Sequence, residues 1–470
     1  MLAMEYQSAH SLLGCPVEVC YSIFSYLSRA DLHDICLVHA NLRTLAEPYL
    51  YSNIQFTWEE ELQPQPITSL LRSLLRRPQL ATYVSRVSLS GSYFHNPFFE
   101  SRAPKILVSE SELEELLGFV RKTTVPYRWT WLEELRNGTM NAFVAVLLSQ
   151  PLRLTCLVID GDFLWESQFI GLVFRSMICE PNAYNCGLRL DFSYLETVSL
   201  QTSYDHFRFY NNARNTADLL PIFYLPSIKR LSASIDNPKT FSWPAIHPPS
   251  SSRLHDLKLE YLRDPFLGQV LSATDQLKSL HWKWHFYEEV YDEQFRMRII
   301  DLTQITKSIS YVRETLTELV ISATNHDDSD PLPLTIQGSM KGMSEFKKLT
   351  KLSIPVTFLM GGWSADLTKR IEDCLPQSLE FSTITDDLSA NNEYRWRDHD
   401  LYNVLERWLK TYQASTPQLC DVKFIFHHPH ENAALAPGLS GLTNKVRVRF
   451  QRVRSGGRGR LGGFGRGRST

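Results

Sequence analysis

The hexapeptide LTELVI, residues 316–321, carries the pattern that decides the fold: one apolar residue, two variable residues, then two apolar residues separated by one. Side chains two residues apart in an extended chain point to the same side, so Leu319 and Ile321 are expected on one face of a strand. Clear copies are LETVSL (195–200), LHDLKL (254–259), LKSLHW (277–282) and LTKLSI (349–354), and weaker ones are Val84-Val87-Leu89, Leu154-Leu157-Ile159, Ile228-Leu231-Ala233 and LCDVKFIF around Val422. Each copy predicts a short strand.

The copies recur at the spacing of a repeat protein. Their middle residues Val198, Leu231, Leu257, Leu280, Leu319 and Leu352 lie 33, 26, 23, 39 and 33 residues apart. One leucine-rich repeat takes about 20 to 29 residues, so the longer intervals leave room for an extra helix or loop. We therefore expect an α/β fold, an irregular leucine-rich-repeat-like solenoid over residues 80–430. The alternative is an ordinary α/β domain with leucine-rich buried strands, because the spacing varies and the usual asparagine position is absent.

Candidate helices and loops fill these intervals. Amphipathic segments follow Ser109 (SELEELLGFVRK), Thr139 (TMNAFVAVLLSQ) and Glu288 (EEVYDEQFRMRIIDLTQITKSI). Residues 204–218, 322–334 and 383–400 are turn-rich and are expected to be insertions between repeats. Their aromatic residues are candidate substrate contacts, namely Tyr204, Phe207, Tyr210 and Trp396, although solvated loops without a binding role are the alternative. The substrate-binding residues stay unknown.

Residues 12–56 have a different pattern, that of a small helical cluster. Pro16 suits a first helical turn, and apolar residues then recur at steps of three and four: Val17, Cys20, Phe24 and Leu27 on one stripe, Val19, Ile23 and Tyr26 on a second. Asp31 is the expected N-cap of a second helix, and a third apolar pattern ends near Pro48. So small a unit has more apolar surface than it can bury, which suits a permanent partner or packing on the rest of the chain.

The same residues resemble the F-box, particularly the fungal form. The resemblance implies docking on a Skp-type adaptor, and through it on a cullin, with the rest of the chain binding a protein substrate. It assigns adaptor contact to Pro16, Val17, Val19, Ile23, Phe24, Leu27, Leu32, Leu37 and Val38. Two positions depart from the usual pattern: Cys15 stands where leucine is common, and His39 stands where cysteine or serine is frequent.

Composition and cysteine usage narrow the class of protein further. The chain is 43% hydrophobic and 21% charged, as folded globular proteins are. Its eight cysteines form no C-x-x-C pair. They indicate free thiols in a reducing compartment, so cytoplasm and/or nucleus is the expected location. Because the N-terminus lacks a signal-peptide pattern and no apolar run is long enough to span a bilayer, we expect no membrane association.

Motifs for catalysis or cofactor binding are missing from the sequence. The histidine-containing groups are His281 with His285, His427-His428-Pro429-His430, and Asp398-His399-Asp400. None offers three converging ligands at a recognised metal spacing, and LKSLHWKWHF is more typical of a strand than of a helix. We expect a non-catalytic protein without a cofactor or metal, and a metal-dependent hydrolase is the weaker alternative.

The C-terminal end changes composition. The last 39 residues contain Lys445, eight arginines and no acidic residue, about +9 in charge. The predicted organisation is an adaptor-binding module (12–56), a helical connector (57–79), the repeat domain (80–430), a basic extension with a possible edge strand (431–454) and a disordered Arg/Gly tail (455–470). Arg, Gly and Phe464 in the tail resemble RGG-type segments, so RNA association is the second functional hypothesis; the alternative for the tail is a solubilising or nuclear-targeting role.

Overall fold

The described part of the 470-residue chain falls into two compact units. The computed structural model describes residues 12–59, 67–92, 105–160, 163, 168–180, 192–201, 219–235, 241–250, 253–286, 298–325, 334–366, 368–426 and 445–452. The first unit contains Met1–Leu262, Ala273–Leu277 and Glu289–Phe295. The second contains Arg263–Ser272, Lys278–Glu288 and Arg296–Thr470.

Six parallel strands form the first unit's sheet, each paired with the next along the chain. They are β1 (Asn53–Glu59), β2 (Arg86–Ser92), β3 (Cys156–Asp160), β4 (Thr197–Gln201), β5 (Arg230–Ser234) and β6 (Asp256–Glu260). Five middle residues of the repeat pattern are in register across β2–β6, and Ile54 of β1 aligns with them; all six are buried: Ile54, Val87, Leu157, Val198, Leu231 and Leu257. The pattern therefore sets both the register and the buried face of the sheet.

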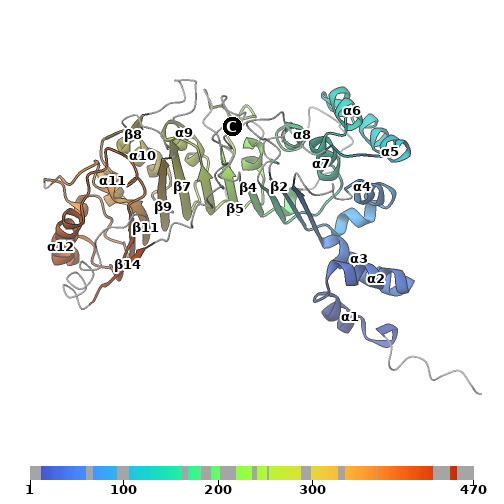
Figure 1. The fold of residues 1–470 in the computed structure, drawn as a ribbon, viewed down its shortest axis with the longest axis horizontal. Helices are drawn as coiled ribbons and strands as arrows, with labels where there is room; N and C mark the ends of the chain where they lie inside the picture. Colours follow the sequence, from blue (N-terminus) through green and yellow to red (C-terminus); the bar gives the residue numbers. More distant parts are fainter. Residues whose placement is uncertain are drawn as a thin grey trace, which may run out of the picture. The chain divides into compact units, whose positions relative to one another are not determined.

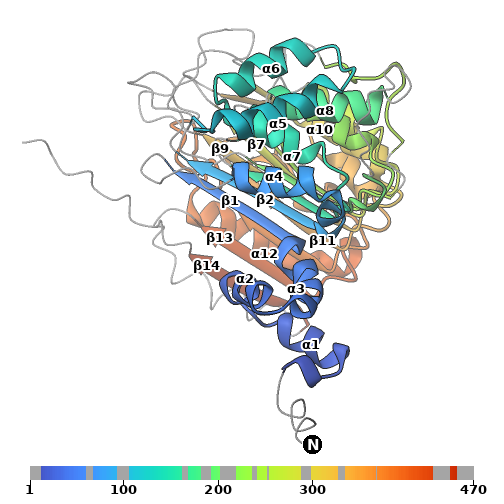
Figure 2. The same ribbon diagram turned by 90° about the vertical axis from the view of Figure 1, so that its right-hand side faces the viewer.

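Helices cover that buried face. In the first unit, α4, α7 and α8 lie on one side of the strands (Figures 1 and 2). Helix α7 is buried along its whole length. The helices are α1 (Val17–Phe24), α2 (Arg29–Val38), α3 (Ala40–Ser52), α4 (Ile67–Arg76), α5 (Glu110–Arg121), α6 (Arg128–Arg136), α7 (Met140–Leu148) and α8 (Gln168–Phe174), with short helices at η1 (Leu12–Gly14), η2 (Pro78–Tyr83), η4 (Arg175–Cys179), η5 (Phe192–Tyr194) and η8 (Leu220–Tyr224).

The second unit repeats the arrangement. Its parallel strands are β7 (Ser279–Phe286), β9 (Glu318–Asn325), β11 (Lys351–Pro355), β12 (Phe381–Thr385), β13 (Asp421–Phe426) and β14 (Arg447–Arg452), paired in that order, and β8 (Ile299–Asp301) pairs separately with β10 (Thr335–Gln337). Its helices are α9 (Asp264–Leu271), α10 (Leu302–Ile309), α11 (Val356–Leu359) and α12 (Asp398–Ser415), with η10 (Ser310–Val312), η11 (Lys341–Glu345) and η12 (Ile371–Asp373). The chain is an α/β protein with a solenoid-like order of parallel strands in each unit.

Every copy of the hexapeptide pattern lies at a strand, and HWKWH lies in β7 as expected. Four strands were not expected: β1, β12 and the two short strands β8 and β10, which pair with each other. Strand β1 occupies residues 53–59, where the module was expected to end and a helical connector to begin; Ile54, Phe56 and Trp58 alternate with polar residues and are buried. Strand β12 was missed because its inward middle position is Ser382, which breaks the leucine pattern.

The segment after Glu288 is only partly the helix that was expected. Helix α10 begins at Leu302 and follows the short strand β8, with Asp301 as its N-cap. Residues 287–297 lie outside the described part, as do residues 202–218 and the tail 455–470.

Candidate adaptor-docking surface

Three short helices at the N-terminus form the candidate module, and polar caps define two of their boundaries. Ser28, rather than the expected Asp31, is the N-cap of α2: its Oγ accepts from the Asp31 N–H at 3.2 Å, and the Asp31 carboxylate accepts from the Ser28 N–H at 3.1 Å. His39 caps α3, because its Nδ1 accepts from the Asn41 N–H at 3.1 Å. The histidine that departs from the F-box pattern therefore starts the third helix.

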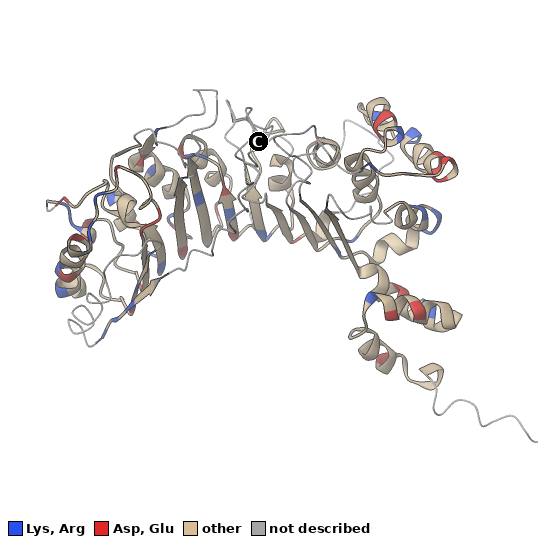
Figure 3. Cartoon of the chain, viewed as in Figure 1, with Lys and Arg blue, Asp and Glu red and all other residues tan. Residues whose placement is uncertain are grey.

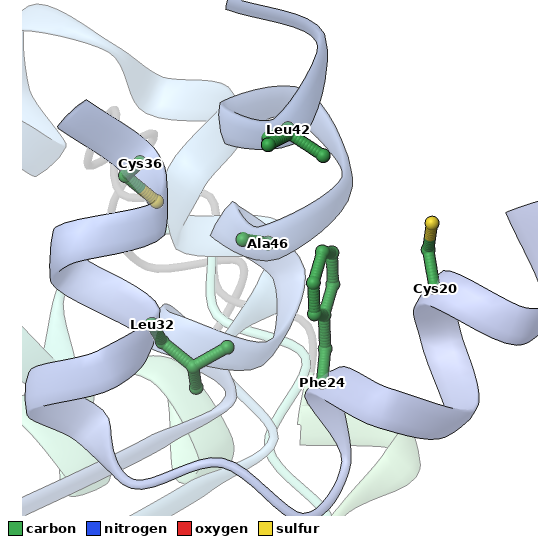
Figure 4. Packing of buried hydrophobic residues seen from close by; sticks show 6 residues of the cluster. All are labelled: Cys20, Phe24, Leu32, Cys36, Leu42 and Ala46. Atoms are coloured by element: carbon green, nitrogen blue, oxygen red, sulfur yellow. The ribbon is translucent and has the colours of Figure 1, made fainter. Parts of the chain in front are cut away.

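The three helices share one apolar core (Figure 4). It contains Cys20 and Phe24 from α1, Leu32 and Cys36 from α2, and Leu42 and Ala46 from α3, all buried. The Phe24 ring lies edge-on to Tyr49, with 6.3 Å between ring centroids. Burial of the Cys36 thiol, and to a lesser extent the charge of Glu47, raises the pKa of Cys36.

Two of the nine residues assigned to adaptor contact belong to this core. Phe24 is 1% exposed and Leu32 is 5% exposed, so both serve the packing of the helices and neither is available to a partner. Ile23 and Leu27 are half-buried and pack against the same cluster. The apolar pattern of residues 12–56 mixes residues that hold the three helices together with residues that face solvent, and sequence spacing alone does not separate them.

The other five assigned residues, Pro16, Val17, Val19, Leu37 and Val38, face solvent. Leu37 is 66% exposed and Val38 is 74% exposed, although both are aliphatic. Tyr26 shares the apolar stripe of Val19 and Ile23 in the sequence pattern and is not among the residues assigned to adaptor contact; its side chain is 89% exposed. We call Val17, Val19, Tyr26, Leu37 and Val38 the exposed apolar set. Helix α2 also carries two exposed acidic residues, Asp31 and Asp34; Figure 3 colours the acidic residues of the chain red.

The module is joined to the first sheet without a linker. Helix α3 ends at Ser52 and β1 begins at Asn53. The carboxylate of Glu47, on α3, is nearly buried and accepts two hydrogen bonds of 2.7 Å from the Arg77 guanidinium beside η2. Hydrogen bonding to Glu47 raises the pKa of Arg77 above its ordinary value. Backbone continuity and this ion pair thus fix α3 against the start of the sheet.

The remaining candidate residues are dispersed. Trp396, expected on an exposed loop, is 3% exposed, and its Nε1 donates to the Gly362 carbonyl at 3.0 Å. Tyr204, Phe207, Tyr210 and the His427–His430 group lie outside the described residues. His281 is half-buried near Glu318, whereas the buried His285 makes a 2.9 Å hydrogen bond with Thr324. Within the described ranges, no group of three or more His, Cys, Asp or Glu side chains is placed to hold a metal ion.

Comparison with known proteins gives only weak similarity, and it is a similarity to solved structures. No model of a known protein family matches the chain, and no curated protein matches it. One similar solved structure is described as the crystal structure of the Rad7 and Elc1 complex in yeast, with 12% sequence identity, a TM-score of 0.30 and 92% of each chain covered. A similarity this low identifies neither a family nor a partner. Among the described helices, none is long and apolar enough to cross a membrane.

Proposed function

We propose that this protein is a substrate-recognition subunit of a cullin-based, SCF-type ubiquitin ligase. The observation that carries the proposal is the exposed apolar set on a helical module whose own core is already complete. Full burial of a valine or leucine side chain contributes roughly 1.5–3 kcal/mol, so a partner that covers these residues gains substantially. The F-box resemblance of the same residues makes a Skp-type adaptor the natural partner.

The other parts of the proposal follow from this docking. The α/β body binds the protein substrate, and the ubiquitin transfer is performed by other subunits, so this chain supplies proximity and no catalysis. Such a ligase subunit acts in the cytoplasm and/or nucleus. Because α3 continues directly into β1, an adaptor docked on α1 and α2 is held close to the start of the first unit's sheet.

A purified Skp-type adaptor tests the proposal by titration calorimetry against the full chain. Two double variants place charge on the exposed apolar set: Val19→Glu on α1 with Tyr26→Glu in the turn that follows it, and Leu37→Glu with Val38→Glu on α2. Burying an unpaired carboxylate is costly, so we expect each to weaken adaptor binding at least tenfold. These positions are solvent-facing, unlike Ile23 and Leu27, whose substitution by charge would also disrupt the core.

The matched control is Ala40→Glu with Thr44→Glu. Both residues are exposed, and their spacing from Leu42 and Ala46 places them on the opposite side of α3. This variant should bind the adaptor as the wild type does, and circular dichroism should show equal helix content for all proteins. The proposal is wrong if the adaptor does not bind the wild-type chain, or if it binds the wild type and both charged variants with equal affinity.

A further inference from the structure

Strand β14 is the last strand of the second unit's series and has one described neighbour. Residues 447–452 pair in parallel with residues 421–426 of β13. The Arg447 N–H donates to the Cys420 carbonyl at 2.9 Å. Within the part of the chain that the structure describes, no strand pairs with the other side of β14.

The register determines which backbone groups face that open side. In a parallel ladder, alternate residues use both their N–H and their C=O toward one neighbour. Because Arg447 donates toward β13, Arg449 and Gln451 do so as well, and the N–H and C=O groups of Val448 and Phe450 face away from β13. An edge of this kind is a template for an added strand.

The side chains beside the edge differ sharply on the two faces of the strand. One face carries Arg447 and Arg449, both exposed, and Lys423 lies beside Arg449 on β13. Lys445, just before β14, adds a further positive charge. Among the described residues of β13 and β14 on this face, the acidic one is Asp421, whose carboxylate accepts hydrogen bonds of 2.7 and 3.2 Å from the Arg449 guanidinium. The other face carries Val448 and Phe450, both half-buried. The Phe450 ring stacks on Phe424 with 5.1 Å between centroids and an interplanar angle of 28°. An added strand would therefore have arginine side chains beside it on one face of the sheet and the side chains of Val448 and Phe450 beside it on the other.

These features select one kind of occupant. Pairing of β14 with a second copy of itself would bring arginine against arginine, which is destabilising. The segment after Arg452 adds five arginines and no acid, so it repels the same face. A nucleic acid would meet the charge but has no strand backbone to pair with Val448 and Phe450. We propose that the open edge of β14 binds an extended acidic peptide segment of a partner protein by strand addition.

Residue-resolved amide hydrogen exchange on the full chain tests the edge itself. Without a peptide, the amides of Val448 and Phe450 should exchange at least tenfold faster than those of Arg447, Arg449 and Gln451. A decapeptide alternating glutamate and valine, used as the probe, should slow the first two amides at least tenfold, because an added strand places glutamate beside the arginines and valine beside Phe450. The proposal is contradicted if, in the free protein, the amides of Val448 and Phe450 are as protected from exchange as the amide of Arg449.

Fluorescence anisotropy with the same dye-labelled peptide tests the two recognition elements separately. Val448→Pro removes an edge N–H without breaking a bond to β13, and Arg447→Glu reverses one charge; each should weaken binding at least tenfold. Two matched controls should bind as the wild type does: Val448→Thr, which keeps the edge N–H, and Lys347→Glu, which reverses the charge of an exposed lysine between η11 and β11. A decapeptide alternating lysine and valine should not bind. Unchanged binding by Val448→Pro, or tight binding of single-stranded RNA that depends on Arg447 but not on Val448, would overturn strand addition.

This site does not depend on the proposed adaptor docking. The double variant Val19→Glu with Tyr26→Glu should bind the acidic decapeptide with the affinity of the wild type. Failure of adaptor binding and failure of peptide binding are therefore separate results.

Discussion

Asp264 is a carboxyl group that folding moves almost entirely out of water. It is 2% exposed at the start of α9, and burial, the largest effect, raises its pKa from the ordinary 3.8 to about 6. Its neighbour Arg263 is 5% exposed, and burial lowers the pKa of that guanidinium to about 10. Both shifts have the same cause: burial destabilises the charged form of each side chain, which raises the pKa of the acid and lowers that of the base.

The pH dependence of stability follows from the sign of the Asp264 shift. Because its folded pKa is above its unfolded pKa, the folded state binds more protons between pH 4 and 6, and the stability from this group is lost as the pH rises through 6. Asp264→Asn does not titrate. We expect the free energy of unfolding of Asp264→Asn, relative to wild type, to rise by on the order of 2–3 kcal/mol between pH 4 and pH 7. Urea unfolding at both pH values measures this, and a pH-independent difference would contradict it.

At the scale of single elements, the ion pair between Glu47 and Arg77 helps to hold the junction between α3 and β1. Arg77→Ala leaves the nearly buried Glu47 carboxylate without its two hydrogen bonds. We expect a loss of about 1–3 kcal/mol in local stability, seen as faster amide exchange across residues 40–59. Arg76→Ala is the matched control, because the adjacent Arg76 pairs with Glu115 on the surface, where such pairs contribute little. Equal exchange in both variants would show that Glu47–Arg77 does not hold the junction.

Sequence patterns predicted elements whose residues obey one periodicity. The leucine pattern predicted the strands at Val198, Leu257 and Leu352, because inward residues of a parallel sheet must be apolar at fixed offsets. It missed β12 because Ser382 occupies the inward position. At the N-terminus the pattern located three helices, but it could not tell Phe24 from Val19, because the distinction depends on where α3 lies in space.

At the scale of the whole molecule, solenoid-like packing should localise damage. In repeat-like folds, each element contacts mainly its neighbours, so a core defect weakens its surroundings first. Trp131 in α6 and Trp408 in α12 are both fully buried, and each indole N–H donates a hydrogen bond, to the Ala142 carbonyl at 3.0 Å and to Thr416 Oγ1 at 3.3 Å. The two tryptophans are a matched pair, one in each compact unit.

Truncation of these tryptophans tests the localisation. Trp131→Ala and Trp408→Ala should each cost about 3–5 kcal/mol. We expect amide protection to fall in α5–α7 for the first variant and in α12, β12 and β13 for the second, with the other unit close to wild type. Uniform loss of protection throughout the chain in either variant would show that the two units unfold as one.

The direct passage from Ser52 to Asn53 also has a geometric consequence. Parallel strands stack about 4.8 Å apart, so each strand of the first unit lies one fixed step farther from α3 than the strand before it. The position of a strand in the series therefore determines its distance from α3. Inserting or deleting one strand-and-helix repeat in the first unit would move the later strands of that unit relative to α3 by one strand spacing, so their distance from α3 would change in steps rather than continuously.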